Sequence, residues 1–542
     1  MASTASASPR AAALPGVRPS WLAGIFLVLA LAGCAFAFVG LTTGGYWTDE
    51  LFSLYIVDHH GGPAEVIRRT LTDTHPPAYY LLLYGWTRVF GLGEAATRSL
   101  SALFSIGAVA IFGLGTGKAL TPAARAFASA CAVGSGFWFF QSQNDRNYGL
   151  AMFALPALLA LALALQDSAR DRKGTVWRHA GLLAAGFLAS LTHFYAFLGA
   201  GAIFAMLVLT GRGLGRKAVF AAEGAAILAV ELVYIHVLVG HTKQNLHQMW
   251  FSNDPGFIAN ELLHAFTSGL GPGSVAAAVL LAGSALWRRG RAAEGPDQAG
   301  WLAGAAALGL IFLIAGGLAV SLLFAPSFSD INVLTGSPFI WALLGALYDR
   351  GAPRGDGAKA PILATALVAL VGLQLAALLP ERFSIHTEQW RETARAVARL
   401  PGCQGREVPA VAPSRFAAPT PFYLELFRRE FFGRYLPGGS DRIHAYPVDY
   451  FGGARPDPHL QGLLSARVHG QDPCPLLAWA DHDMKADGAA RLAAAIAGST
   501  GVQASRIEVR TFYDRKLLWL GERRRATAFL ILARPAGVGP GA

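Results

Sequence analysis

Tyr46-Trp47-Thr48-Asp49-Glu50-Leu51-Phe52-Ser53-Leu54-Tyr55 is the polar segment around which the chain is organised. It follows directly on a long apolar run, Trp21 to Leu41, so two adjacent carboxylates stand at the mouth of an expected membrane helix. A carboxylate in that place is costly to keep unless it has a role, which makes Asp49 and Glu50 candidate catalytic residues. The alternative is that both acids only cap the next helix, because carboxylates are favoured at helix N-termini.

Composition places the chain among membrane proteins. Of its 542 residues, 53% are hydrophobic and only 15% are charged. Apolar runs of about 20 residues, each bounded by charge, predict a polytopic α-helical membrane protein. The net charge of +11 does not indicate nucleic-acid binding, because much of the excess lies in short loops between apolar runs.

The apolar runs predict about eleven transmembrane helices. They fall near 19–41, 98–117, 123–140, 148–166, 179–192, 194–210, 218–240, 273–287, 300–324, 335–348 and 361–380. We therefore expect a disordered segment at 1–17, a transmembrane domain at 18–380 and a soluble domain at 381–542.

Basic residues predict the orientation. They gather in alternate loops, which the positive-inside rule places in the cytoplasm together with the N-terminus. The other loops and everything after residue 380 then face outward. The outer loop 42–97 holds a short aromatic-rich segment, 76–91, which is too short to cross a bilayer and is expected to lie in the outer interface.

The last part of the chain has a different pattern. Strands are expected at 476–480, 506–510 and 528–532, and helices at 390–398 and 487–497, which predicts a C-terminal α/β domain. Cys403 and Cys474 could form a disulfide there if this part faces an oxidising compartment.

Four polar clusters are expected on the outer side. They are Asp49-Glu50, Asp73-Thr74-His75-Pro76-Pro77, Gln141-Ser142-Gln143-Asn144-Asp145-Arg146-Asn147-Tyr148 and Thr192-His193-Phe194-Tyr195. Each has a simple structural explanation: a helix start for His75, an interface anchor or local ion pair for Arg146 with Asp145, and a tight turn for His193. Together they offer a base, an imidazole and a guanidinium beside apolar surface, which suits a lipid-linked anionic substrate.

The motifs follow a recognisable order: W-x-D-E, H-P-P-x-Y-Y, A-T-R-S-L-S-A-L-F and Q-x-x-x-x-R-x-Y-x-L. This order resembles the GT-C superfamily of membrane glycosyltransferases, within it the branch of protein O-mannosyltransferases, aminoarabinose transferases and bacterial RgtA/B/C/D-like proteins. Trp390-Arg391-Glu392, just past the last run, is also typical of bacterial members. The resemblance covers residues 20–200 well and the rest loosely.

The resemblance implies a reaction. Members of the superfamily transfer a sugar from a polyprenyl-phosphate carrier to an acceptor on the outer face of the membrane. Asp49 matches their catalytic base, and Asp145 matches a second acidic position by its location. Arg146 and Tyr148 match the R-x-Y pair, and His75 stands where some relatives carry a basic residue.

Further substrate-binding candidates are Tyr79 of the H-P-P-x-Y-Y motif and His193. Many relatives carry an arginine near the start of a late span that contacts the carrier phosphate. This chain has Asp330-Ile331-Asn332 at that place.

The chemistry needs no nucleotide. A base would deprotonate the acceptor while the sugar is attacked from the face opposite the phosphate, so a single displacement would invert the anomeric centre. No cofactor is indicated with certainty, although Asp49, Glu50, Asp145 and His75 could hold a divalent metal. The acceptor class stays open among lipid, glycan and protein.

Two other functions compete with a glycosyltransferase. A transporter or flippase of lipid-linked sugars would usually show internal repeats and broken helices at mid-membrane, and the sequence shows no repeat. A receptor-like scaffold would place its function in the outer domain alone. The Ala/Gly/Arg-rich composition indicates a high-GC bacterium, which predicts the inner membrane with a periplasmic C-terminal domain.

Overall fold

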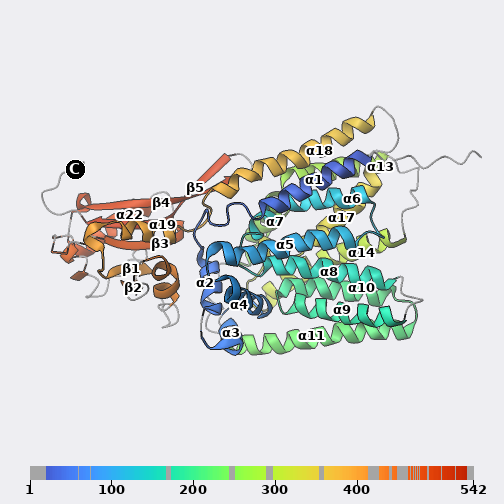
Figure 1. The fold of residues 1–542 in the computed structure, drawn as a ribbon, viewed down its shortest axis with the longest axis horizontal. Coiled ribbons are helices and arrows are strands. Elements are labelled where there is room, and N and C mark those ends of the chain that lie inside the picture. The colour runs from blue at the N-terminus through green and yellow to red at the C-terminus, as the bar shows by residue number, and fades with distance from the viewer. Residues whose placement is uncertain are drawn as a thin grey trace, which may run out of the picture.

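The chain folds into a bundle of helices with a five-stranded sheet at one end (Figure 1). We refer to this end of the bundle as the outer end. This computed structural model describes residues 20–533 without 59, 72, 74, 167–171, 243–250, 288–296, 353–358, 413–425, 437, 439–441, 448–461, 464, 468, 470, 473, 475, 485–487, 502 and 519–520. The segment 1–17, expected to be disordered, lies outside the described residues.

Five segments of the described residues are long and apolar enough to cross a membrane. They are α5 (Glu94–Gly115), α8 (Tyr148–Gln166), most of α11 (Leu214–Thr242), the run α14 (Asp297–Ile311), η3 (Phe312–Gly316) and α15 (Gly317–Leu323), and the run α18 (Lys359–Leu378) and η4 (Leu379–Phe383). A sixth is added if a bent pair forms one broken span, in which α12 (Pro255–His264) and η2 (Ala265–Gly269) meet α13 (Pro272–Trp287).

The other apolar runs form shorter or less apolar helices. They are α1 (Ser20–Phe36), α6 (Pro122–Val133), α7 (Gly136–Gln141), α9 (Arg172–Ser190), α10 (Phe194–Thr210) and α17 (Ser337–Gly351). The run 123–140 is divided because Ser135 begins α7 by accepting the backbone N–H of Trp138. Length and composition therefore support five or six of the roughly eleven spans expected from the sequence.

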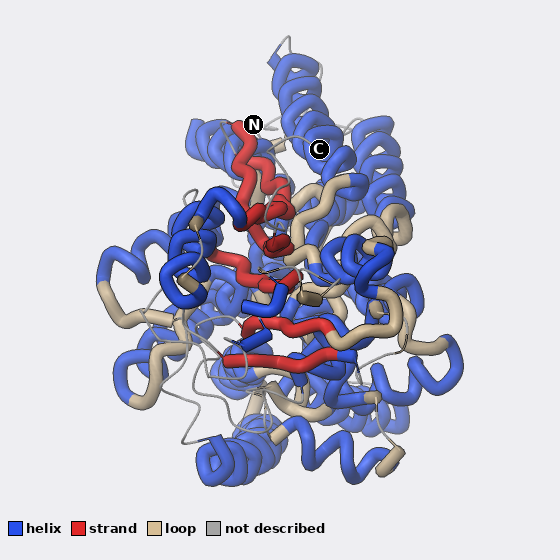
Figure 2. Tube along the Cα trace, turned by 90° about the vertical axis from the view of Figure 1, so that its left-hand side faces the viewer, coloured by secondary structure: helices blue, strands red, loops and turns tan. Residues whose placement is uncertain are grey.

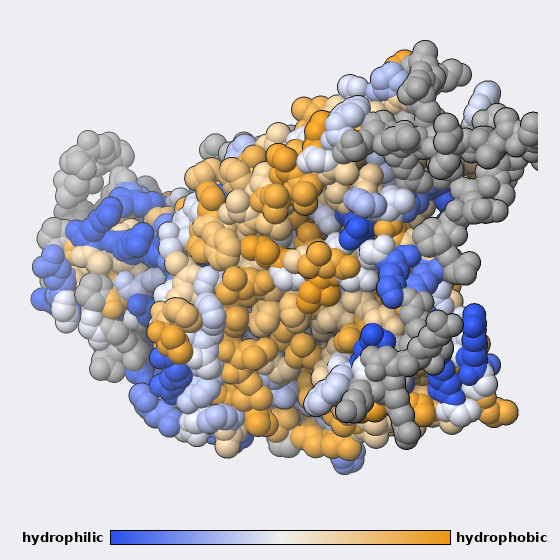
Figure 3. Space-filling view, turned by 45° about the vertical axis from the view of Figure 1, so that its right-hand side comes forward, coloured by the Kyte–Doolittle hydropathy of each residue, from blue (hydrophilic) through white to orange (hydrophobic). Residues whose placement is uncertain are grey.

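The surface of the bundle is suited to hydrocarbon. Figure 3 shows hydrophobic residues over the middle of the helices and hydrophilic residues at both ends. Leu114, Leu232 and Leu323 are among the large apolar side chains exposed on these helices. An apolar zone between two hydrophilic ends, as this face shows, is expected of a protein embedded in a bilayer.

The outer loop 42–97 folds into three short helices at the outer end (Figure 1). They are α2 (Thr48–Val57), α3 (Gly62–Thr70) and α4 (Ala78–Phe90). The helix expected at 76–91 is α4, which begins after Pro76-Pro77 and ends at Gly91, whose positive φ of 84° favours glycine. Figure 1 shows α4 nearly end-on, so it lies across the bundle axis, as expected for an interfacial helix.

The C-terminal part is built on a mixed sheet, whose strands are red in Figure 2. Its order is β2-β1-β3-β5-β4, with β1 (Val408–Ala412), β2 (Ile443–Pro447), β3 (Leu476–Met484), β4 (Ile507–Leu518) and β5 (Gly521–Ala533). β1 pairs in parallel with β2 and β3, whereas β5 pairs antiparallel with β3 and β4. The helix α19 (Trp390–Ala398) packs on β3 and β5, and α22 (Gly488–Thr500) packs on β4 and β5.

One apolar core joins the sheet to the outer loop. Leu51 and Leu54 of α2 lie in the same buried cluster as Trp390 at the start of α19. The indole of Trp390 packs edge-on against Phe431 and Phe432, at 4.5 and 5.2 Å between ring centroids. The helix that carries Asp49 is therefore packed against the C-terminal part as well as against the bundle.

Cys403 and Cys474 form a disulfide that closes 71 residues of the C-terminal part. Both cysteines are buried in the core that α2 shares. A disulfide persists in an oxidising compartment, so this bond agrees with the expectation that the C-terminal part faces outward.

We expect Cys403→Ser to lower the free energy of unfolding by about 2–4 kcal/mol, because the unfolded chain is then no longer constrained by the crosslink. Denaturant unfolding in detergent, with and without a reductant, measures this loss. The half-buried thiol of Cys34 provides the control, and Cys34→Ala should show no such loss. A wild-type protein as stable in reductant as without it would contradict the prediction.

Candidate functional site

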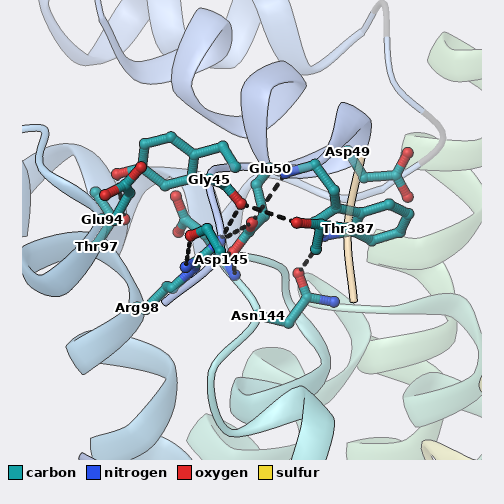
Figure 4. Close-up of polar contacts among 12 residues, drawn as sticks. Gly45, Asp49, Glu50, Glu94, Thr97, Arg98, Asn144, Asp145 and Thr387 are labelled. Carbon is teal, nitrogen blue, oxygen red and sulfur yellow. Dashed lines mark hydrogen bonds and ion pairs between the residues drawn. The ribbon is translucent and has the colours of Figure 1, made fainter. Parts of the chain in front are cut away.

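The two adjacent acids of α2 point in different directions (Figure 4). Glu50 turns inward and is only 1% exposed, and its carboxylate binds Arg98 of α5 through two hydrogen bonds of 2.6 and 2.8 Å. Asp49 is half-buried, and its carboxylate is directed away from that pair. The opposite orientations follow from their positions, because consecutive residues of a helix lie on different faces.

Glu50 has both carboxylate oxygens occupied. Besides Arg98, its Oε1 accepts the backbone N–H of Asp145 at 2.9 Å, and its Oε2 accepts that of Trp47 at 3.2 Å. Arg98 also donates to the carbonyl oxygens of Leu41, Gly44 and Gly45. The pair thus fixes the linker before α2 and the loop 142–147 to α5, and this geometry favours a positioning role for Glu50 over the catalytic one expected from sequence.

Asp145 is completely buried behind Glu50. Its Oδ1 accepts the hydroxyl of Tyr79 at 2.7 Å, and that hydroxyl also lies 3.0 Å from Ser101. Burial, reinforced by the negative charge of Glu50, raises the pKa of Asp145 to about 7. Tyr79 therefore holds the second acid of the site in place, and its hydroxyl is committed to that contact.

The raised pKa of Asp145 predicts a dependence of stability on pH. Below the ordinary pKa of 3.8 the group is protonated in both states, but between that value and about 7 only the unfolded state ionises. The folded state therefore loses stability as pH rises through this range, by about 1.4 kcal/mol per unit of pKa shift. Asp145→Asn removes this titration while keeping an acceptor for Tyr79.

We expect the stability of Asp145→Asn relative to wild type to increase by more than about 1 kcal/mol between pH 4 and pH 8. Unfolding of both proteins at several pH values measures the difference. A difference that does not change with pH would contradict the pKa assigned to Asp145.

Arg146 is the centre of a second polar cluster and is only 4% exposed. Its Nη1 lies 3.0 Å from the hydroxyl of Tyr80 and 3.4 Å from a carboxylate oxygen of Asp73. The same nitrogen lies 3.4 Å from the backbone oxygen of Asp49, which joins the cluster to α2. The Nε of Arg146 has no hydrogen-bond partner among the described residues, so one of its donors is left for a ligand.

Two imidazoles and a phenol line the cluster. The rings of His75 and His193 lie 5.2 Å apart, and that of Tyr148 lies 6.3 and 5.6 Å from them. Burial lowers the pKa of His75 to about 4, and burial with the neighbouring His75 and Arg146 lowers that of His193 well below its ordinary value. Both imidazoles are therefore neutral at pH 7, and they offer hydrogen bonds rather than charge.

The two ring nitrogens of His193 have different surroundings. Its Nδ1 accepts the backbone N–H of Tyr195 and so begins α10, which is the structural explanation. Its buried Nε2 has no hydrogen-bond partner among the described residues and lies in the cluster of Arg146. With Nδ1 as acceptor, Nε2 carries the proton and is a donor.

The late loop also reaches this cluster. Asn332 of α16 (Asp330–Leu334) lies close enough to His193 to affect its pKa. Asp330, at the place where the resemblance led us to expect an arginine, pairs with His264 at 2.6 Å. Among the described residues, no group of three or more His, Cys, Asp or Glu side chains is arranged to hold a metal ion.

Four residues of the site were not predicted as site residues from the sequence: Asp73, Tyr80, Arg98 and Glu388. Asp73, Tyr80 and Arg98 stand within or beside the quoted motifs. For Asp73 and Arg98 the available signal was a charged residue among apolar neighbours, and both are buried in the structure. Glu388 has no such signal, because its partner lies 340 residues away in the sequence.

The arrangement of helices matches known structures. ArnT from Cupriavidus metallidurans, an aminoarabinose transferase, superimposes with a TM-score of 0.54 at 13% identity, over 94% of this chain and 98% of that one. The chain has the fold of the GT-C membrane glycosyltransferases. The GT-C fold is also shared with ArnT bound to undecaprenyl phosphate, with a TM-score of 0.53 at 14% identity, over 96% of this chain and 100% of that one.

A mycobacterial arabinofuranosyltransferase, AftD, matches at 14% identity with a TM-score of 0.49, over 96% of this chain and 40% of that one. No protein-family model and no curated protein sequence gives a significant match. The fold shared with ArnT agrees with the GT-C resemblance of the motifs.

Proposed function

We propose that the chain is a glycosyltransferase that moves a sugar from a polyprenyl-phosphate carrier to an acceptor at the outer face of the membrane. The observation that carries this proposal is that Arg146 reaches α2 beside the candidate base, because its Nη1 lies 3.4 Å from the backbone oxygen of Asp49, 97 residues away in the sequence. A base and a cationic group with an unpartnered donor stand together at the outer end of an apolar bundle. The structure of ArnT with bound undecaprenyl phosphate supports a lipid-phosphate donor for this fold.

Asp49 is the proposed general base. It is the acid whose carboxylate turns away from Arg98. Glu50 is instead paired with that arginine, and Asp145 is buried with a raised pKa. A base takes the proton of the acceptor hydroxyl as its oxygen attacks the anomeric carbon. The bond from that carbon to the phosphate breaks on the opposite face, so the product has inverted configuration.

Arg146 is the proposed partner of the departing phosphate. Charge develops on the phosphate oxygen as the sugar leaves, and a fixed guanidinium stabilises that charge in a site with little water. Its Nε is buried and has no partner among the described residues, while Asp73 and Tyr80 hold the rest of the group in place. His75, Tyr148 and His193 would contact donor or sugar as neutral groups, and Tyr79 would act through Asp145.

A transporter of lipid-linked sugars is the second candidate. It is less well supported because the polar clusters lie at one end of the bundle, whereas transporter sites lie near mid-membrane between related halves. We further propose the inner membrane of a bacterium, with a cytoplasmic N-terminus and a periplasmic C-terminal part. The disulfide between Cys403 and Cys474 supports the outward placement of that part.

Mass spectrometry of envelope glycolipids and glycans, from cells with and without the full chain, tests the proposal. A sugar modification that disappears without the protein, and returns with the wild-type gene but not with Asp49→Asn, would support transfer. Movement of lipid-linked sugar in proteoliposomes without any glycosidic product would instead support the transporter.

A further inference from the structure

Three consecutive backbone N–H groups at the start of α2 are accepted by one side chain of the helix itself and by two side chains from the C-terminal part. That of Tyr46 is accepted by the hydroxyl of Tyr435 at 3.0 Å, and that of Trp47 by Glu50 at 3.2 Å. The N–H of Thr48 is accepted by Oε2 of Glu388 at 3.3 Å. Donors at a helix start have no partner within the helix, so outside groups decide how firmly the first turn is held.

Glu388 makes two contacts with the residue directly before Asp49. Its Oε1 accepts the hydroxyl of Thr48 at 3.1 Å, in addition to the backbone bond, and the side chain is only 3% exposed. A carboxylate at this end of a helix also interacts favourably with the helix dipole. Glu388 thus fixes the first turn of α2 from outside the helix.

The segment that carries Glu388 is itself anchored to the linker before α2. Thr387 donates to the carbonyl of Gly45 at 3.1 Å, and Arg391 donates to those of Thr42 and Thr43 at 3.0 and 2.8 Å. The linker before α2 is therefore hydrogen-bonded both to Thr387 and Arg391, which follow the last span, and to Arg98 of α5.

We propose that Glu388 is a positioning residue for Asp49, a role that rests on the proposed function. Glu388 acts through Thr48 at the start of α2, and it thereby determines the position of the Asp49 carboxylate. A displacement of a reacting group by about 1 Å can cost up to about 100-fold in rate. The C-terminal part of the chain would then take part in transfer through this contact.

If Glu388 only stabilised the fold, its loss would lower the unfolding midpoint, whereas a positioning role predicts a loss of rate. The body of α2 remains fastened by the pair of Glu50 with Arg98 and by the burial of Leu51 and Leu54 when Glu388 is altered. Loss of the carboxylate should therefore loosen the first turn without unfolding the helix. The rate should fall while the unfolding midpoint hardly changes.

The test uses the full chain in membranes of the producing cells, with the polyprenyl-phosphate-linked sugars extracted from the same cells as donor and release of polyprenyl phosphate as the readout. We expect Glu388→Gln to lower kcat by about tenfold, with the KM for the donor changed less than about twofold. Glu388→Asp keeps the charge and should recover much of the rate. Asp472→Asn is the matched control, because Asp472 is a carboxylate that pairs with Arg467 within the C-terminal part.

A double-mutant cycle with Thr48→Ala tests the route of the effect. If Glu388 acts through Thr48, the two losses combine to less than their product, because both variants weaken the bond between the Thr48 hydroxyl and Glu388. Losses that multiply, or a Glu388→Gln protein with wild-type kcat beside an inactive Asp49→Asn, would overturn the inference and leave the proposed function standing. An active Asp49→Asn would instead overturn the proposed function itself.

Discussion

Asp49→Asn should leave the protein folded in the membrane and lower the rate of sugar transfer by about 10²- to 10⁴-fold, the usual contribution of a general base. The amide has nearly the shape of the carboxylate but cannot accept the proton of the acceptor hydroxyl. Asp49 is half-buried and stands apart from the buried pair of Glu50 with Arg98, so its neutralisation should not disturb that pair. Transfer is measured as glycosylated product formed by equal amounts of membrane-inserted protein.

Asp58→Asn is a suitable control for this result. Asp58 is the residue at the other end of α2, where it contacts Arg429 and Arg434 of the C-terminal part. It is a carboxylate at the opposite end of α2 from Asp49 and is paired with arginines of the C-terminal part, so its loss should leave the rate near that of wild type. Full activity in Asp49→Asn would remove the base from the proposed mechanism.

Glu50→Gln should have the opposite phenotype, with the loss appearing in stability. Removing one partner of a buried ion pair leaves an uncompensated charge and typically costs about 3–5 kcal/mol. Arg98 is 5% exposed, and a neutral amide at position 50 would leave its buried charge without the counter-charge of Glu50. Denaturant unfolding in detergent measures the loss, together with the amount of protein that inserts into membranes.

The double variant Glu50→Leu with Arg98→Met separates charge from packing. Replacing both members of a buried pair by apolar residues is often close to neutral, so this protein should be more stable than Glu50→Gln. A Glu50→Gln protein within about 1 kcal/mol of wild type would show that Arg98 does not depend on Glu50. The site geometry therefore predicts that Asp49→Asn lowers the rate of transfer, whereas substitution of the adjacent Glu50 lowers stability.

The helical architecture and the position of the site were accessible from sequence. Period and length of the apolar runs located the helices, and the polar clusters around Asp49, His75, Arg146 and His193 do meet at the outer end. Pattern alone could not separate Asp49 from Glu50, because their roles depend on which face of α2 meets Arg98. That decision is made by tertiary packing between residues 48 apart.

The number of spans and the role of Glu388 were less accessible, for different reasons. Short apolar helices such as α1 and α10 have the composition of spans but not their length. The contact of Glu388 with Thr48 joins segments 340 residues apart, and a single sequence contains no local pattern that reports such a pairing.

The core that α2 shares with the C-terminal part also sets an order of events during biosynthesis. Tyr46 leaves the ribosome 389 residues before Tyr435, its hydrogen-bond partner. At roughly 5–20 residues per second, the interval is on the order of 20–80 s. For that time the apolar face of α2 has no permanent neighbour from the sheet, so the nascent loop must be shielded by the membrane surface or by chaperones until translation of the last segment is complete.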